Sequence, residues 1–197
     1  MCIYFGKRFR LGCEVIPLLF LFYSLSEPLF FVCILNVVLH ELFHVFTALS
    51  LNRRITAAAV YMFGADISFS GAGDYLSNAF IAASGALGSI ISGGIFLIAY
   101  RFFPSTYLYL TALFAILYGA FNLLPVAALD GGRCAASLLS FFLDIEIAER
   151  IMNVLSVTVL IPMWLFGVCL LFYTSFNFHL LIVSTYLFFD LVARQGP

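Results

Sequence analysis

Long apolar segments separated by short polar connections make up most of this chain. A transmembrane helix needs about 20 mostly apolar residues, and six segments reach or approach that length. They cover residues 12–26, 28–51, 76–100, 105–124, 151–173 and 177–193. The first and the last of them are short for a complete span. The pattern predicts an all-α polytopic membrane protein with about six transmembrane helices.

Two of the connections predict structure of their own. Residues 55–75 are too polar to span a membrane, and the short apolar runs on either side of Gly64 predict a short β-hairpin after the second helix. Residues 125–150 begin with a proline and become amphipathic over 134–143. They predict a broken segment after the fourth helix, followed by an interfacial helix.

Composition agrees with this class. The chain is 64% hydrophobic, 18% aromatic and 10% charged, with a mean hydropathy of +1.12, whereas soluble domains are only about half apolar. The net charge of -1 offers nothing to attract nucleic acid. None of the five cysteines forms a C-x-x-C pair, so they are interpreted as small apolar residues. No linker, charge run or repeat divides the sequence, which predicts one transmembrane domain over residues 1–197.

The basic residues predict an orientation, because Lys and Arg gather on the cytoplasmic side of a membrane. With six spans and both termini in the cytoplasm, the other side receives only Arg101. The cytoplasmic side receives Lys7, Arg8, Arg10, Arg53, Arg54, Arg133, Arg150 and Arg194. Five spans would scatter these charges over both faces.

Chemistry concentrates in the second apolar segment, which contains the sequence His40-Glu41-Leu42-Phe43-His44. On an α-helix, residues four apart lie about 40° apart around the axis and about 6 Å apart along it. Both imidazoles can therefore bind one metal ion, and Glu41 can approach a water on that ion without being a ligand. A chance match in a polar helix is the alternative. Ionisable groups are costly within a span, however, and a divalent metal would compensate that cost.

A catalytic zinc ion usually has three protein ligands, so two histidines leave the site incomplete. His179 is one candidate, although its place at the start of the sixth span favours a solvated or interfacial histidine. Among the carboxylates, Asp130 is distinctive because it follows a proline break and precedes Gly131-Gly132, which allow a tight turn. An ordinary turn aspartate is the alternative.

The two motifs together resemble the site-2 protease family of intramembrane zinc metalloproteases (peptidase family M50). H-E-x-x-H at residues 40–44 is followed by N-x-x-P-x-x-x-L-D-G-G at residues 122–132, each in or beside a predicted span. The small size and six predicted spans look most like the bacterial sporulation factor IVFB branch. Members with PDZ or CBS domains exist, and neither domain is expected within residues 1–197.

This resemblance implies a role for five residues. His40, His44 and Asp130 would bind one Zn²⁺ ion, and Glu41 would be the general base. Asn122 matches the family asparagine that holds substrate or stabilises the oxyanion; hydrogen bonding to a neighbouring helix is the alternative. Where the family often has G-P-x-x-N, this chain has Gly85-Ala86-Leu87-Gly88-Ser89. No role is carried over to Ser89. The small residues Gly85, Gly88, Ser89, Ser92, Gly93 and Gly94 are predicted to form a close helix-packing face.

The resulting prediction is an intramembrane zinc endopeptidase of regulated intramembrane proteolysis. Its partners would be the lipid bilayer and membrane-embedded or membrane-associated protein substrates, and regulatory partner proteins would be compatible with it. We expect a multi-pass protein of a bacterial cell membrane whose active site opens to the cytoplasm. An inactive zinc-binding membrane scaffold is one alternative, and the intact Glu41 argues against it. A metal or proton transporter is another, but it would need polar residues along several spans.

Overall fold

The structure is a computed structural model, and it describes residues 2–5, 9–12, 27–61, 64–70, 74–173 and 178–194. Within these ranges the chain forms four strands and six helices. The strands are β1 (Cys2–Phe5), β2 (Phe9–Gly12), β3 (Arg54–Tyr61) and β4 (Gly64–Ser70). The helices are α2 (Glu27–Ser50), α3 (Tyr75–Phe102), α4 (Thr106–Asn122), α5 (Asp130–Phe142), α6 (Ile145–Tyr173) and α7 (His179–Arg194).

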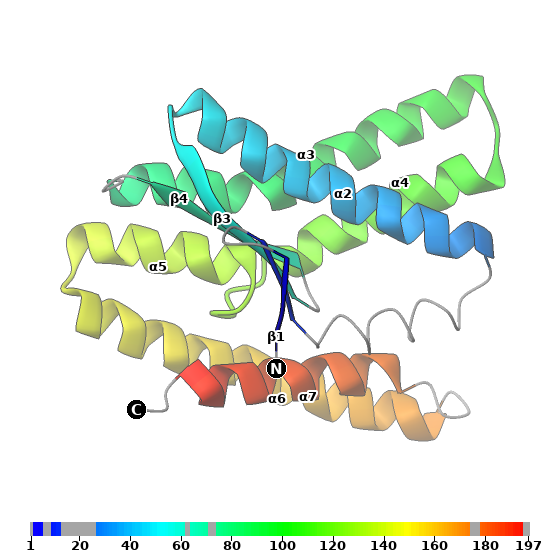
Figure 1. Cartoon of the computed structure of the whole chain (residues 1–197). Coiled ribbons are helices and arrows are strands. Elements are labelled where there is room, and N and C mark those ends of the chain that lie inside the picture. The colour runs from blue at the N-terminus through cyan, green and yellow to red at the C-terminus, as the bar shows by residue number, and fades with distance from the viewer. Residues whose placement is uncertain are drawn as a thin grey trace.

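Helix α3 is the centre of the arrangement, because it packs against α2, α4 and α5 (Figure 1). Helix α5 also contacts α6, and α6 pairs with α7 in a separate layer at the bottom of the view. Val126 and Leu129, in the turn before α5, pack into a core with Leu160, Leu187 and Leu191 of that layer. The turn between α4 and α5 is therefore anchored on the layer formed by α6 and α7.

Three of the described helices are long and apolar enough to cross a membrane. These are Leu29–Ser50 within α2, Tyr75–Phe102 and Ile145–Tyr173, while Thr106–Asn122 is a shorter apolar helix. Large side chains such as Phe31, Phe46 and Phe166 are more than half exposed. Apolar exposure of this extent suits lipid contact better than water, and the chain is accordingly a membrane protein.

The predicted fold class is wrong in two respects. The chain is not all-α, because β1, β2, β3 and β4 form one four-stranded sheet in that order. Strands β3 and β4 are antiparallel at the residues where an isolated hairpin was expected, and β2 joins β3 in parallel register, with Arg10 opposite Ala59. The prediction missed β1 and β2 because their sequence precedes an apolar run and was read as its charged flank.

The number of membrane spans is the second correction. Three described helices, rather than about six, meet the length and hydropathy of a span. Helix α4 has 17 residues and α7 has 16, so apolar patterning alone overstated what they can cross. Most of the first predicted segment, residues 13–26, lies outside the described residues, and residue 12 ends β2. The segment after α4 contains α5, which begins at Asp130 rather than at residue 134.

Candidate metal centre

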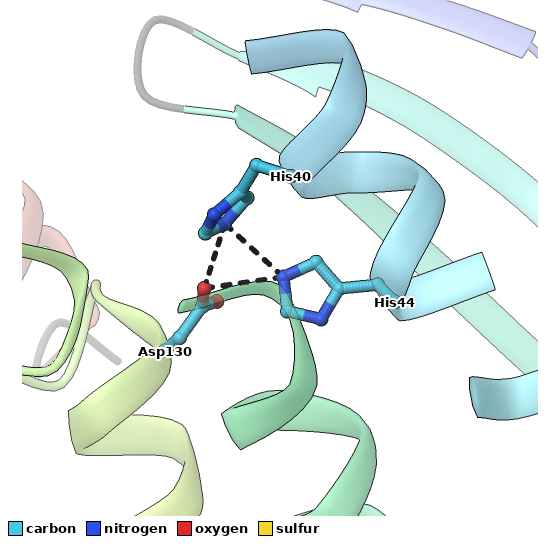
Figure 2. Close-up of side chains that lie close together, drawn as sticks. All are labelled: His40, His44 and Asp130. Atoms are coloured by element: carbon cyan, nitrogen blue, oxygen red, sulfur yellow. Dashed lines mark hydrogen bonds and ion pairs between the residues drawn. The ribbon is translucent and has the colours of Figure 1, made fainter. Parts of the chain in front are cut away.

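His40, His44 and Asp130 come together although Asp130 lies 86 positions after His44 (Figure 2). The His40 Nε2 atom lies 2.8 Å from Asp130 Oδ2, and the His44 Nε2 atom lies 3.1 Å from the same oxygen. The two Nε2 atoms are 3.3 Å apart. All three side chains are buried, with His40 only 2% exposed. Two nitrogens and one carboxylate oxygen therefore surround one point inside the protein.

The protonation of His44 is fixed by its other ring nitrogen. His44 Nδ1 lies 2.7 Å from the carbonyl oxygen of Ile81 on α3, and a carbonyl oxygen can only accept a hydrogen bond. Nδ1 must therefore carry a proton. In the neutral ring, Nε2 then presents a lone pair towards the Asp130 carboxylate, which can only accept hydrogen bonds. A cation, either a proton or a metal ion, is needed to stabilise this arrangement.

The donor set fits a zinc ion. Imidazole nitrogen and carboxylate oxygen are common zinc ligands, and ligand atoms about 2.1 Å from a tetrahedral ion lie about 3.4 Å from one another. The three candidate ligand atoms lie within 4.8 Å of one another, and their individual separations, from 2.8 to 3.3 Å, are somewhat shorter than the tetrahedral value. Three protein ligands also leave a fourth position open, as catalytic zinc sites require.

Close packing of α3 against α2 sets the position of His44. A Cβ atom at Gly85 would lie 2.1 Å from His44 Nε2 and 2.5 Å from Cε1. No side chain other than hydrogen at position 85 would leave the imidazole where it is. The glycine thus lets the ring lie directly over α3, where it can reach the Ile81 carbonyl.

Asp130 is placed by an unusually tight connection from α4 to α5. A Cβ at Gly131 would lie 2.1 Å from the Leu123 carbonyl oxygen, and one at Gly132 would lie 2.0 Å from that of Val126. The two glycines let the first turn of α5 fold directly onto the preceding backbone. The Ser156 hydroxyl of α6 accepts a hydrogen bond of 2.9 Å from the Ala127 N–H, which ties the connection to α6.

The pKa values of two side chains on α5 reflect the charges of the cluster. Burial by itself raises the pKa of the Asp130 carboxyl, but interaction with His40 and His44 lowers it by more, so its pKa lies below the ordinary value. One turn further along, burial and then the Asp130 charge raise the pKa of the Cys134 thiol. Cys134 is not part of the cluster of candidate ligand atoms, which contains His40, His44 and Asp130.

The other predicted site residues lie nearby. Glu41 is half-buried on α2 and is near enough to His44 to interact with it electrostatically. Asn122, at the end of α4, is buried, and its side-chain amide donates to the Tyr118 carbonyl oxygen at 3.0 Å within its own helix. His179 begins α7, where its ring stacks on Phe178, and it is not part of the histidine–aspartate cluster.

Sequence reasoning missed several residues around the cluster. The Ser89 hydroxyl lies 2.9 Å from His40 Nδ1, and the Tyr118 ring packs edge-on against the His40 ring with centroids 4.9 Å apart. Ile81 contributes only its backbone carbonyl, so its side-chain identity carries no signal. Gly85 and Ser89 are four residues apart, as His40 and His44 are. This equal spacing was the signal in the sequence that could have indicated contact between the two pairs.

Fold and site together describe a membrane protein with a buried histidine–histidine–aspartate cluster that could hold one metal ion. The solved structure of "Site-2 Protease from Methanocaldococcus jannaschii" matches all of this chain and 95% of its own, with a TM-score of 0.77 and 24% identity. In sequence, the chain is 29% identical over 170 residues to "Zinc metalloprotease MJ0392" of the same organism. That alignment covers 82% of this chain, which spans about half the length of the relative.

These two comparisons confirm the resemblance to the site-2 protease family that the paired motifs indicate. The more detailed placement in the sporulation branch is not confirmed by either. A scan against models of protein families gave no match.

Proposed function

We propose that this chain is an intramembrane zinc endopeptidase, with His40, His44 and Asp130 as the ligands of one Zn²⁺ ion. The observation that carries the proposal is the convergence of their three ligand atoms inside the protein, with His44 Nδ1 already bonded to a carbonyl. The Nε2 lone pair of neutral His44 and the Asp130 carboxylate would repel each other in an apolar setting. A divalent cation bound by both would turn this contact into a favourable one.

Glu41 would serve as the general base and acid. Glu41 directly follows His40 on α2, so its side chain leaves the helix about 100° around the axis from that of His40. It can therefore lie beside the metal ion without being one of its ligands. Zinc, when bound, supplies a Lewis acid that polarises a peptide carbonyl and makes water more acidic. Glu41 would accept a proton from the attacking water and return it to the leaving amine nitrogen.

Asn122 is proposed to hold the substrate or its developing oxyanion. One N–H of its amide is used by the Tyr118 carbonyl, and a primary amide has a second N–H to donate. The burial of Asn122 at the end of α4, directly before the connection that carries Asp130, supports this role.

The substrates are proposed to be membrane-embedded or membrane-associated proteins. Support comes from the intramembrane fold and from the location of His40 and His44 on α2, one of the helices able to span a bilayer. Cytoplasmic termini and a site that opens to the cytoplasm of a bacterial cell are part of the same proposal. Regulatory partner proteins are compatible with the exposed apolar faces.

The decisive experiment compares purified wild-type protein with Glu41→Gln, in detergent and in bilayers. A panel of single-span membrane peptides would be incubated with each, and fragments identified by mass spectrometry, while bound zinc is measured on the same samples. Glu149→Gln is the matched control, because Glu149 is exposed on α6.

We expect about one zinc ion per chain in all three proteins, and cleavage by the wild type and Glu149→Gln only. Loss of the general base should reduce the rate by about 10²–10⁴-fold. Cleavage that survives in Glu41→Gln would contradict the assigned mechanism. Wild-type protein that binds no zinc would contradict the site itself.

A further inference from the structure

Ser89 lies on α3 and contacts the side of His40 that faces away from the cluster. Its hydroxyl oxygen is 2.9 Å from His40 Nδ1, across 49 positions of sequence, and the residue is only 2% exposed. The opposite ring nitrogen, Nε2, is the atom that lies 2.8 Å from Asp130 Oδ2. The direction of the hydrogen bond between Ser89 and Nδ1 therefore determines whether Nε2 of the neutral His40 ring carries a proton or a lone pair.

The two histidines differ in how this outer nitrogen is held. The partner of His44 is the Ile81 carbonyl, which fixes one tautomer because it can only accept. The partner of His40 is a hydroxyl, which can accept from Nδ1–H or donate to a bare Nδ1. In the second case the proton of the neutral ring is on Nε2, where it is donated to Asp130 and blocks the nitrogen.

We propose that Ser89 is a positioning residue, which accepts a hydrogen bond from His40 Nδ1–H and so keeps Nε2 available as a metal ligand. This inference rests on the proposed zinc endopeptidase function and adds a residue to it. With Ser89→Ala, a buried Nδ1–H would have no acceptor at this position. The ring would instead favour the tautomer with the proton on Nε2, which is satisfied by Asp130 and cannot bind metal.

The nearest matched control is another buried serine of the same helix. The Ser92 hydroxyl donates to the Ser89 carbonyl oxygen at 2.9 Å, which is a bond within α3 only. Ser92→Ala therefore removes a buried hydroxyl and a helix hydrogen bond without touching His40. If Ser89 served only helix packing or helix bending, the two alanine variants would behave alike.

The test measures zinc affinity by competition with a chelator of known affinity, on the full chain in detergent, together with the thermal midpoint. Loss of a residue that orients a metal-binding histidine typically weakens metal binding by about 10–100-fold. We expect a loss of this size for Ser89→Ala, and an affinity within about threefold of wild type for Ser92→Ala. Ser89→Thr, which keeps the hydroxyl on the same carbon, should also stay within about threefold when its thermal midpoint is unchanged.

A second readout is the visible spectrum of the Co²⁺-loaded protein, because its bands depend on the number and geometry of the ligands. Ser89→Ala should alter this spectrum and Ser92→Ala should not. Wild-type affinity in Ser89→Ala, equal losses in both alanine variants, or a weakened Ser89→Thr of normal stability would each overturn the proposal. Wild-type protein that binds zinc but cuts no peptide would contradict the proposed activity alone, since the affinity comparison does not depend on turnover.

Discussion

Gly85→Ala is the smallest change that should disable the site, because it adds one methyl group directly beneath His44. The added Cβ would lie 2.1 Å from Nε2, 2.5 Å from Cε1 and 2.7 Å from Cδ2. Ordinary contacts of this kind begin at 3.4 Å. The imidazole must therefore retreat by about 1.3 Å or rotate away, whereas metal–ligand distances tolerate only about 0.2 Å.

The displacement also stretches the bond that fixes the tautomer of His44. Its Nδ1 lies 2.7 Å from the Ile81 carbonyl oxygen, and a shift of about 1.3 Å away from α3 would take it beyond hydrogen-bonding distance. Zinc would lose one of three protein ligands. We expect the zinc affinity to fall at least about 100-fold, which corresponds to about 2.7 kcal/mol.

Helix α3 provides its own control in Gly94, whose added Cβ would have no heavy atom within 4 Å. Gly94→Ala should bind zinc as the wild type does and raise the thermal midpoint slightly, because alanine favours a helix over glycine by about 1 kcal/mol. The assay is chelator competition on detergent-solubilised protein, with circular dichroism to confirm helix content. Wild-type zinc affinity in a folded Gly85→Ala protein would refute the placement of α3 against His44.

Two further predictions concern the connection that carries Asp130. Asp130→Ala should lower zinc affinity by at least about 100-fold, whereas Asp144→Ala, which changes an exposed residue just after α5, should not. A chelator should therefore lower the thermal midpoint of Asp144→Ala and leave that of Asp130→Ala unchanged, because only a bound metal ion stabilises the folded state. Ser156→Ala removes the acceptor of the Ala127 N–H, so chemical denaturation should show a free energy of unfolding lower by about 1–3 kcal/mol. Thr158→Ala loses only an exposed hydrogen bond within its own helix and should lower the free energy of unfolding by less. Equal losses would mean that the Ala127 hydrogen bond does not stabilise this connection.

The cluster was accessible from sequence because its residues follow local rules. His40 and His44 share a helix face by periodicity alone, and the apolar setting made their presence costly unless they shared a ligand. Asp130 was identified by its motif. The tight packing of Gly131 and Gly132 against the Leu123 and Val126 carbonyls supplies the physical reason for that motif. A side chain at either position would push the first turn of α5, and Asp130 with it, away from α4.

The sheet could not be predicted in the same way, because its pairings are not local. Strand β2 lies beside β3 through Phe9–Ala58, Arg10–Ala59 and Leu11–Val60. Strand β2 has only four residues, and neither strand contains a signal for a partner that lies nearly fifty positions away. Runs of four apolar and basic residues fit the flank of a membrane helix as well as they fit a strand, and only the tertiary pairing distinguishes the two.

The small residues of α3 were predicted to form a single packing face, but they have different neighbours. Gly94 borders open space, whereas a Cβ added at Gly93 would lie 2.9 Å from the Ala112 carbonyl oxygen of α4. Gly85 and Ser89 face α2 instead. A stripe of small residues indicates close approach to some neighbour, but which neighbour each residue meets depends on how α3 is rotated, and that is decided by contacts with three other helices.

The rotation of α3 determines which of its residues contacts each histidine of α2. Helices α2 and α3 present residues four apart to each other in opposite sequence order, so that His40 meets Ser89 and His44 meets Gly85. The earlier histidine receives a hydroxyl and the later one receives space to reach a backbone carbonyl. Each imidazole is thus held from behind by α3 and directed towards Asp130. The geometry of the candidate metal site is therefore a property of the α2–α3 interface as much as of the histidine motif, which by itself specifies only that the two rings share a face.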